Sequence, residues 1–294
     1  MPQSNNVDRV EKDVGVIGLG LMGTAIVERL LQHGYRVAVW NRSPEKAERL
    51  LQLGAVWSDN PLAECSRVIV SLYSSAVVAE IIERMLTGPC AVQVIVDTTT
   101  GEPSDAVTLS RRLAERGVKY LGAPISGSSQ QTRRGDATVI VDGEPSDFDA
   151  CADLWPVLGC KVFHVGACGS AAKTKLVTNL VLGLNRAALA EGLSFAESIG
   201  ISPERALEVL EGSVAYSRTM ETKGRKMIEK DFRVEARLSQ HLKDVRLMLD
   251  EAQAAGCDLH LTQTHARLLE TAEAAGCGEL DNSAIIKVYA RSDS

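Results

Sequence analysis

The chain has 294 residues, of which 45% are hydrophobic and 24% charged, so it is long enough for two domains with a sizeable core. Its formal net charge of −6 offers none of the clustered basic surface that nucleic acid or an anionic membrane requires. Residues 1–13 are polar, and no run of eighteen apolar residues occurs, so we expect a cytoplasmic protein without a signal peptide or membrane span.

Seven cysteines are spread along the chain without a Cys-x-x-Cys pair, and the five histidines form no cluster in the sequence. An odd number of separated cysteines argues against a disulfide framework and against structural zinc. We therefore predict no metal site, a reducing compartment, and thiols that mostly fill the core. The short basic pair Arg133–Arg134 is expected in a solvated loop.

The first half of the chain alternates short β-branched segments with helical segments, which is typical of a parallel sheet covered by helices. The predicted strands are, in chain order, residues 14–19, 36–40, 67–72, 92–96, 119–121, 138–142 and 161–164. The predicted helices of this half are residues 22–32, 44–53, 76–86, 103–116 and 147–158.

The pattern changes at Gly166. Residues 170–199 contain no proline, and their apolar residues recur at helical spacing. A helix of this length extends about 45 Å at 1.5 Å per residue. Gly183 and Gly192 interrupt it at a cost of about 1 kcal/mol each relative to Ala, which indicates close packing against another helix.

The rest of the chain is also predicted to be helical, with stops at Gly200, Gly256 and Gly276. We therefore predict an α/β domain over residues 1–168. An all-α domain over residues 169–294 follows it and is opened by the long interdomain helix.

Residues 14–23 read Val-Gly-Val-Ile-Gly-Leu-Gly-Leu-Met-Gly and contain the spacing G-x-G-x-x-G. The motif alone is weak, but here it follows a β-branched strand, opens a helix and precedes a second strand. Gly18 permits a tight turn, Gly20 lets the backbone approach a pyrophosphate, and Gly23 lets the helix pack closely on the strand. The first domain is therefore predicted to be a Rossmann dinucleotide-binding domain. Its predicted phosphate turn consists of Gly18, Leu19, Gly20, Leu21, Met22 and Gly23.

The end of the second strand indicates which dinucleotide binds. NAD sites usually place Asp or Glu there for the ribose 2′-hydroxyl, and a carboxylate repels a 2′-phosphate. This chain has Asn41, Arg42 and Ser43, which remove the repulsion and supply donors for phosphate oxygens. Ser43 before Pro44 also suits the start of a helix, and the two roles are compatible. We predict NADP(H) as the cofactor.

Three further motifs follow along the chain. They are Asp97-Thr-Thr-Thr-Gly-Glu-Pro103, Ala123-Pro-Ile-Ser-Gly127, and the run from Gly166 through Lys175 to Asn179. With the glycine turn, these motifs resemble the signatures of the β-hydroxyacid dehydrogenases. That family includes 3-hydroxyisobutyrate dehydrogenase and the glyoxylate/succinic semialdehyde reductases, and it is more distantly related to 6-phosphogluconate dehydrogenase. The resemblance runs from Val14 to Tyr289 and implies an NADP(H)-dependent oxidoreductase that interconverts a small β-hydroxy acid and its semialdehyde. It also implies a homodimer or homotetramer.

The resemblance assigns Ser126 and Gly127 to substrate binding, and a hydroxyl beside backbone N–H groups is a natural carboxylate cradle. Lys175 and Asn179 are four residues apart and share one helix face. A partly desolvated lysine beside a nicotinamide can exchange the hydroxyl proton as hydride moves, so Lys175 is the predicted general acid/base. Asn179 is expected to hold the substrate oxygen and orient the lysine. The resemblance also places three residues at the cofactor: Leu72, Thr100 and Lys243.

Several positions depart from the family pattern. Gly122 stands where an Asp commonly precedes Ala-Pro, and Ser128 replaces a glycine. Thr178 replaces an asparagine, and Ala236 stands where many members have Phe. A smaller residue at position 236 reshapes the acyl pocket, and Arg237 beside it is a candidate partner for a second substrate carboxylate. The identity of the substrate therefore stays open.

Two alternatives are also open. Imine reductases share this fold and NADP(H), but they usually replace the catalytic lysine with Asp or Tyr, so Lys175 argues against that activity. A non-catalytic module that binds NADP and interacts with proteins is disfavoured by the joint presence of Lys175, Asn179 and Ser126.

Overall fold

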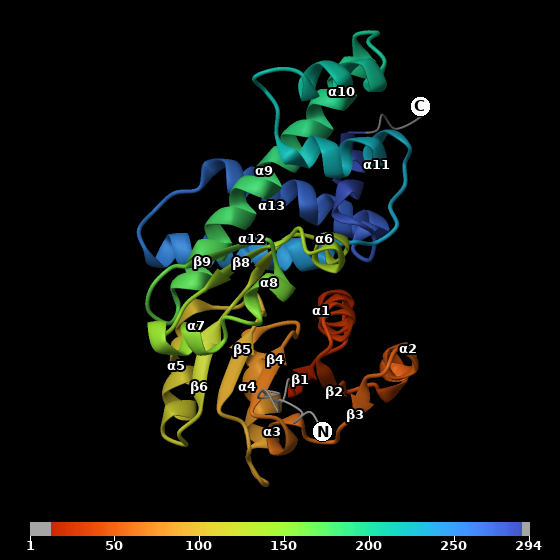
Figure 1. The fold of residues 1–294 in the computed structure, drawn as a ribbon. Helices are drawn as coiled ribbons and strands as arrows, with labels where there is room; N and C mark the ends of the chain where they lie inside the picture. Colours follow the sequence, from red (N-terminus) through yellow and green to blue (C-terminus); the bar gives the residue numbers. More distant parts are fainter. Residues whose placement is uncertain (1–12, 290–294) are drawn as a thin grey trace. The chain divides into compact units, whose positions relative to one another are not determined.

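The structure is a computed structural model that describes residues 13–289, and the chain divides into two compact units, Met1–Lys175 and Leu176–Ser294 (Figure 1). The N-terminal unit contains all the described strands, and the C-terminal unit is helical. This confirms the predicted α/β domain followed by an all-α domain. The boundary between the two units falls within the long helix α9 (Ser170–Ser198), between Lys175 and Leu176. The domain boundary between residues 168 and 169 stays a prediction.

A six-stranded parallel sheet forms the centre of the N-terminal unit, in the order β3-β2-β1-β4-β5-β6. The order reverses direction between β1 and β4, so a crevice for a dinucleotide is expected at the carboxyl ends of these strands. The strands are β1 (Asp13–Ile17), β2 (Arg36–Trp40), β3 (Val56–Trp57), β4 (Arg67–Val70), β5 (Val94–Asp97) and β6 (Lys119–Gly122).

Two apolar cores cover the two faces of this sheet, because successive strand residues point to opposite faces. Val14 and Val16 of β1 pack in one core with Ile26 of α1, whereas Ile17 packs in the other with Ile81 of α4. The helices that follow the strands are α1 (Leu21–Gln32), η1 (Pro44–Ala47), α2 (Glu48–Gln52), α3 (Pro61–Glu64), α4 (Ser75–Met85) and α5 (Pro103–Ala114).

A second, three-stranded sheet completes the unit, with β7 antiparallel to β8 and β8 parallel to β9. Its elements are β7 (Ile125–Ser126), α6 (Ser129–Arg134), β8 (Thr138–Val141), α7 (Pro145–Ala150), α8 (Trp155–Leu158) and β9 (Lys161–His164). The two-residue strands β3 and β7 are too short to give a period-2 pattern, which explains why the sequence predicted neither.

Two local predictions in this region are wrong. The predicted helix 147–158 is broken by turns between α7 and α8, because Pro156 lacks an N–H and fits only in the first turn of a new helix. The Arg133–Arg134 pair does not lie in a loop but ends α6, and Arg133 Nε donates to Glu28 Oε2 at 2.6 Å.

The C-terminal unit consists of the greater part of α9 and seven further helical segments among the described residues. They are α10 (Pro203–Glu211), η2 (Met220–Gly224), α11 (Arg225–Ile228), α12 (Leu238–Ala254), α13 (His260–Ala272), η3 (Glu273–Cys277) and η4 (Asn282–Tyr289). The predicted stops at Gly200 and Gly256 are confirmed, since each follows a helix and has a positive φ that does not continue it. Gly276 also has a positive φ but lies inside η3, where it marks a kink.

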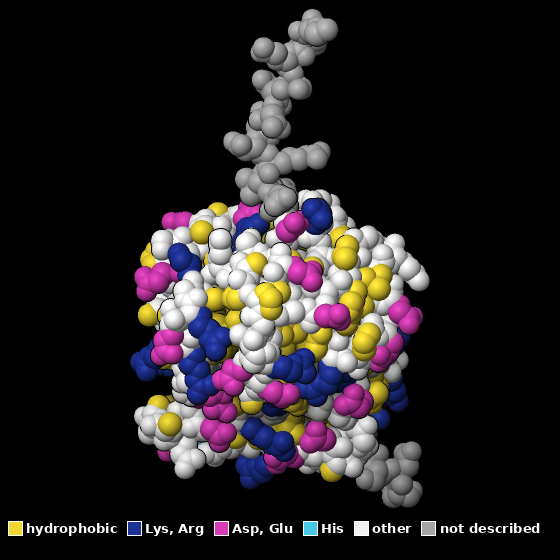
Figure 2. Space-filling view, turned by 90° about the horizontal axis from the view of Figure 1, so that it is seen from below, with side chains coloured by type: hydrophobic (Ala, Val, Ile, Leu, Met, Phe, Trp, Pro, Cys, Tyr) yellow, Lys and Arg dark blue, Asp and Glu magenta, His cyan; other side chains and the backbone are white. Residues whose placement is uncertain are grey.

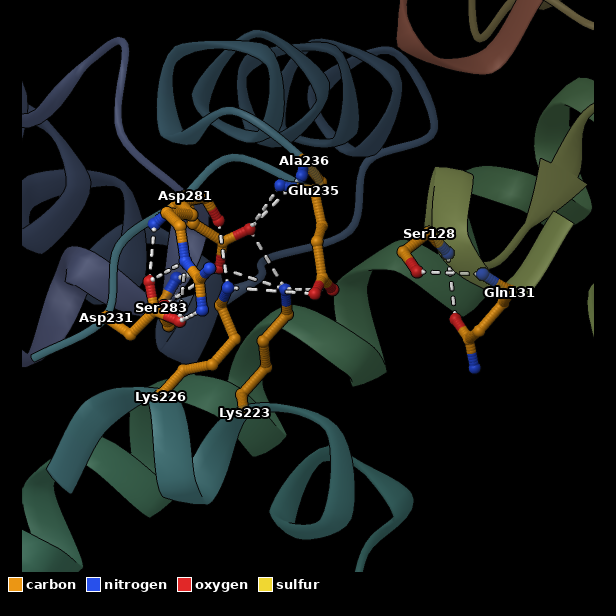
Figure 3. Close-up of polar contacts among 10 residues, drawn as sticks. Ser128, Gln131, Lys223, Lys226, Asp231, Glu235, Ala236, Asp281 and Ser283 are labelled. Atoms are coloured by element: carbon orange, nitrogen blue, oxygen red, sulfur yellow. Dashed lines mark hydrogen bonds and ion pairs between the residues drawn. The ribbon is translucent and has the colours of Figure 1, made fainter. Parts of the chain in front are cut away.

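A buried ion pair organises this unit (Figure 3). Lys223 Nζ lies 2.9 and 3.0 Å from the two carboxylate oxygens of Asp281, which also accept N–H bonds from Glu235 and Ala236. Burial by itself raises the pKa of Asp281, but Lys223 and the N–H groups of Glu235 and Ser283 outweigh it and hold the pKa below its ordinary value. The pair therefore anchors the segment before α12 to the start of η4.

The face shown in Figure 2 carries acidic and basic side chains interspersed, with hydrophobic side chains between them. Within residues 13–289, no group of three or more His, Cys, Asp or Glu side chains could hold a metal ion. None of the helices in that range combines the length and the apolar composition needed to cross a bilayer. All seven cysteines are free: Cys65, Cys151 and Cys277 lie in the apolar cores, Cys168 is partly buried against one of them, and the other three are exposed.

The two glycines of α9 provide a matched test of packing. A Cβ on Gly183 would lie 2.4 Å from Nε2 of His241 and 2.7 Å from Cε1 of His265, whereas a Cβ on Gly192 would have no described atom from outside its own stretch of helix within 4 Å. We predict that Gly183→Ala destabilises the protein by about 1–3 kcal/mol through overpacking. Gly192→Ala should stabilise it by up to about 1 kcal/mol through helix propensity. Urea unfolding followed by circular dichroism measures both, and equal effects would contradict this packing.

Candidate active site

The glycine turn connects the end of β1 to α1. Gly18 has φ 99°, and a Cβ there would lie 2.2 Å from the carbonyl oxygen of Ser71. A Cβ on Gly23 would lie 1.8 Å from the carbonyl oxygen of Gly18. These two glycines are required by the close packing of the chain itself.

Gly20 differs from its neighbours in the turn. Within residues 13–289, no atom beyond its chain neighbours lies within 4 Å of the place where its Cβ would be, so packing in this range does not require a glycine there. Gly20 is the N-cap of α1, which has no side-chain cap and no acidic residue in its first turn. The first N–H groups of α1 are therefore suited to an anion, and the open space at Gly20 fits a pyrophosphate that approaches the backbone.

Asn41 joins the end of β2 to the glycine turn. Its Oδ1 accepts the N–H of Leu19 at 2.9 Å, and its Nδ2 donates to the carbonyl of Ser43 at 3.0 Å. Both polar atoms of the Asn41 amide therefore bond within the chain. Asn41 thus holds the turn in place, in addition to removing the negative charge that an Asp or Glu would bring. Ser43 is the N-cap of η1, as the sequence predicted, but its side chain makes no capping bond.

Arg42 extends from the same strand end into solvent. Its side chain is 67% exposed, and Nη2 lies 3.8 Å from Oε1 of Glu80, whose side chain is 63% exposed. A pair this long and exposed contributes little, so the guanidinium can exchange Glu80 for a phosphate. Glu80 lies on α4, 38 residues further along the chain, and no local pattern in the sequence pointed to it.

Residues after β4 and β5 are linked by side-chain bonds. The N–H of Leu72 donates to Oγ1 of Thr99 at 3.1 Å, and the N–H of Thr99 donates to Oδ1 of Asp97 at 2.8 Å. The hydroxyl of Tyr120 donates to the other oxygen of Asp97 at 2.9 Å. Burial raises the pKa of Asp97, although these donors oppose the rise. Asp97 and Thr99 thus hold the predicted cofactor residue Leu72, and Thr100 follows directly after them.

The predicted substrate loop lies at β7 and the start of α6. Ser126 is half-buried and pairs in register with Thr138 of β8, and Gly127 follows it. Ser128 caps α6: its Oγ accepts the N–H of Gln131 at 3.2 Å, and its own N–H donates to Oε1 of Gln131 at 2.8 Å (Figure 3). Ser128 replaces a glycine of the family pattern, and its part in this capping box explains the replacement.

Lys175 and Asn179 lie one turn apart on α9, and both are buried, whereas Lys173 is exposed. The Nδ2 of Asn179 donates to Oδ2 of Asp244 at 3.0 Å, and Lys243 Nζ lies 3.3 Å from Oδ1 of the same carboxylate. Asp244 therefore fixes the orientation of the Asn179 amide from α12. The sequence had singled out Lys243 of this pair for a cofactor role rather than Asp244.

Arg237 lies at the start of α12. Its Nε lies 2.9 Å from Oε2 of Glu279, and the residue forms the N-cap of α12. The guanidinium thus has a carboxylate partner from this chain in an exposed pair, and a contact with a second substrate carboxylate stays a prediction.

The comparison with known proteins identifies the family. The family described as "NAD binding domain of 6-phosphogluconate dehydrogenase" matches residues 13–166. The family described as "NAD-binding of NADP-dependent 3-hydroxyisobutyrate dehydrogenase" matches residues 169–289. The chain belongs to the β-hydroxyacid dehydrogenase family. It is an oxidoreductase that acts on CH–OH groups with a nicotinamide dinucleotide, which confirms the predicted family, enzyme class and type of cofactor.

Similar proteins include both enzymes and a nuclear factor. The β-hydroxyacid dehydrogenase chain is 31% identical to 2-(hydroxymethyl)glutarate dehydrogenase of Eubacterium barkeri, over 94% of each chain. It is 31% identical to 2-hydroxy-3-oxopropionate reductase of Escherichia coli, over 93% of this chain and 96% of the relative. It is also 30% identical to cytokine-like nuclear factor N-PAC of Anopheles gambiae, over 96% of this chain but only 51% of that longer protein.

Solved structures of two kinds resemble this β-hydroxyacid dehydrogenase. Psf3 in complex with NADP+ and 2-OPP matches with a TM-score of 0.83 at 25% identity, over 94% of this chain and 100% of that one. An imine reductase from Pseudomonas sp. matches with a TM-score of 0.65 at 26% identity, over 95% and 99% of the two chains. The similarity in fold is greater for the former.

The three glycines of the turn should separate folding from cofactor binding. We predict that Gly20→Ala lowers the free energy of unfolding by no more than about 1 kcal/mol, because alanine is a poorer N-cap than glycine. It should weaken binding of the dinucleotide by about tenfold or more, because the methyl group enters the open space.

Gly23→Ala is the control, because its Cβ would overlap the carbonyl of Gly18. We expect it to lower the unfolding temperature sharply. Thermal unfolding without cofactor and fluorescence titration with NADPH measure the two effects. If Gly20→Ala binds the dinucleotide as tightly as the unmodified protein, the assignment of the open space is wrong.

Proposed function

We propose that this enzyme interconverts a small β-hydroxy acid and its semialdehyde with NADP(H), and that Lys175 is its general acid/base. The observation that carries the proposal is a buried lysine one helical turn from Asn179, whose amide Asp244 orients. Lysines are rarely buried, and a buried ionisable side chain within a signature motif of the family is a candidate functional residue. The names of two relatives support the substrate class, since both denote short acids that carry a hydroxyl or oxo group.

In the oxidation direction, Nζ of neutral Lys175 accepts the proton of the substrate hydroxyl while hydride leaves the carbon that bears this hydroxyl. Reduction is the reverse. The bound nicotinamide supplies or takes the hydride. Asn179 donates to the substrate oxygen or orients Lys175 toward it. Ser126 and the N–H of Gly127 bind the substrate carboxylate, and this charge-assisted bond selects acids over neutral aldehydes.

The preference for NADP(H) rests on the end of β2. Arg42 is exposed, makes a long contact to Glu80, and follows an uncharged Asn41. The complex of Psf3 with NADP+ supports this choice. A cytoplasmic location and a homodimer or homotetramer remain predictions from the sequence.

Imine reduction is the second candidate, and the similarity to an imine reductase structure favours it. It requires a group that protonates an imine nitrogen, and Lys175 fits the alcohol chemistry better. The similarity to half of N-PAC leaves a non-catalytic interaction module as the third. NADPH oxidation measured against short-chain semialdehydes and cyclic imines distinguishes the candidates. Turnover of semialdehydes alone is expected, turnover of imines alone supports the second, and binding without turnover supports the third.

The 2′-phosphate contact predicts a difference between two variants. Arg42→Ala should cost about 1.5–3 kcal/mol of NADP(H) binding, the range for hydrogen bonds to charged groups, and leave NAD(H) binding unchanged. Glu80→Gln, its matched control, should keep or strengthen NADP(H) binding because it removes the competing carboxylate. Calorimetric titration with both dinucleotides measures these affinities. Equal dissociation constants for NADP(H) and NAD(H) in the unmodified protein would defeat the proposed preference.

The acid/base role predicts a large kinetic effect at one lysine and none at its neighbour. Lys175→Met should lower turnover by about 10²–10⁴-fold, the usual contribution of a positioned acid/base group, and leave NADPH affinity within about twofold. Lys173→Met, at an exposed position two residues earlier, should retain turnover within about twofold. Steady-state kinetics with the best semialdehyde measures both. A Lys175→Met enzyme that keeps more than about a third of the turnover contradicts the mechanism.

A further inference from the structure

A buried carboxylate joins three segments of the N-terminal unit. Asp142 follows β8 directly and is 1% exposed. Its Oδ1 accepts the N–H of Gly122 at the end of β6 at 2.9 Å. Its Oδ2 accepts the N–H of Ala171 in the first turn of α9 at 2.8 Å, and the N–H of Gly169 also donates to the carboxylate.

The glycine at position 122 makes room for this carboxylate. A Cβ on Gly122 would lie 2.6 Å from Oδ1 of Asp142, closer than real Cβ contacts. The carboxyl group of Asp142 thus occupies the space into which a side chain at position 122 would extend. Many family members have Asp at the position of Gly122, and the sequence alone did not explain the glycine. The carboxylate of Asp142 explains it, because it leaves no room for a side chain at position 122.

The carboxylate also serves the helix that carries Lys175. α9 has 29 residues and no acidic residue in its own first turn, so its N–H groups and dipole have no local anion. Asp142 supplies one from 29 residues away. Ala171 lies one turn before Lys175, and helical side chains lean toward the N-terminus, so this bond fixes the turn over which Lys175 extends.

We propose that Asp142 is a positioning residue for catalysis, which sets Lys175 of α9 relative to the Ser126 loop that continues from β6. The loop begins at Ala123, directly after the Gly122 N–H that Asp142 holds, and reaches Ser126 three residues later. One side chain therefore fixes the starting points of both predicted substrate-binding segments. The proposal rests on the function proposed above for Lys175 and Ser126.

The surroundings of Asp142 make this contact sensitive to substitution. Burial raises the pKa of Asp142, and the three backbone N–H groups and His164 oppose the rise. Asp97 and Tyr120 line the same cavity of about 20 Å³, which has room for roughly one water molecule. The side-chain oxygen of an asparagine at 142 can accept the N–H of either Gly122 or Ala171. Its NH2 group would then face the remaining N–H, so that two donors oppose each other.

The first test compares Asp142→Asn with Asp147→Asn, which removes another buried carboxylate of the unit, the partner of Lys119 and not of α9. Hydrogen exchange followed by mass spectrometry should show exchange of residues 169–172 accelerated by about 10- to 100-fold in Asp142→Asn alone. The value of kcat/KM for the best semialdehyde should fall by about tenfold or more, because a displacement of about 1 Å costs up to 10²-fold. NADPH affinity should stay within about twofold in both variants.

The outcomes separate positioning from stability alone. Unchanged exchange at residues 169–172 overturns the proposal, and so does faster exchange with an unchanged kcat/KM. If the unmodified enzyme reduces no semialdehyde and oxidises no hydroxy acid, the proposed function fails on its own. The rate of acetylation of Lys175 relative to Lys173 by acetic anhydride then decides: a change in Asp142→Asn supports positioning of Lys175, and equal ratios overturn it.

A second test moves the carboxylate from position 142 to position 122, across the contact between these two residues. Gly122→Asp alone should unfold at a much lower temperature, since it adds a clash and a second buried carboxylate. Asp142→Gly alone should lose the bond to α9. The double variant Gly122→Asp/Asp142→Gly restores one carboxylate in the same space, so it should exceed both single variants in unfolding temperature and in protection of residues 169–172. A double variant no better than the worse single variant contradicts the proposal.

Discussion

The close approach of α1 to β1 is the constraint on which the cofactor site depends. Gly23 lies against the carbonyl of Gly18, and Gly18 lies against the carbonyl of Ser71, so neither position has room for a Cβ. This contact directs the first N–H groups of α1 to the carboxyl end of β1, where the sheet order reverses. Asn41 then fixes the turn from the neighbouring strand through the N–H of Leu19. The proposed pyrophosphate site is thus made by backbone, and the side chains around it mainly hold that backbone in place.

Buried carboxylates at strand ends extend the same principle toward the substrate. Asp97 ends β5 and Asp142 follows β8, and each is occupied by donors from this chain. Burial raises the pKa of both groups, so their hydrogen bonds must offset the loss of solvent. Acids of this kind are poorly placed for proton transfer with a substrate. Their donors instead fix the segments that carry Leu72, Ser126 and Lys175.

The C-terminal unit uses paired charges in a similar way. Asp244 orients Asn179, and Asp281 with Lys223 anchors the segment that leads into α12. Burial, followed by the nearby charge of Arg186, lowers the pKa of His265 to about 4, so this ring is neutral at physiological pH. It can therefore pack against the backbone of α9 at Gly183 without the cost of a buried charge.

Local sequence patterns predicted the elements whose cause is local. The β-branched segments gave the longer strands, the glycine spacing gave the phosphate turn, and the four-residue spacing placed Lys175 and Asn179 on one helix face. The two-residue strands and the break before Pro156 were missed, because short elements have no period and turns compete with helix.

The tertiary structure decided which distant groups meet. The bond from Asp142 to Ala171 spans 29 residues, the bond from Asn179 to Asp244 spans 65, and Glu80 of α4 reaches Arg42 in the turn after β2. A carboxylate in a sequence shows its charge but not its burial or its donors. Those follow only when the chain has folded, because strand order and helix packing bring the partners together.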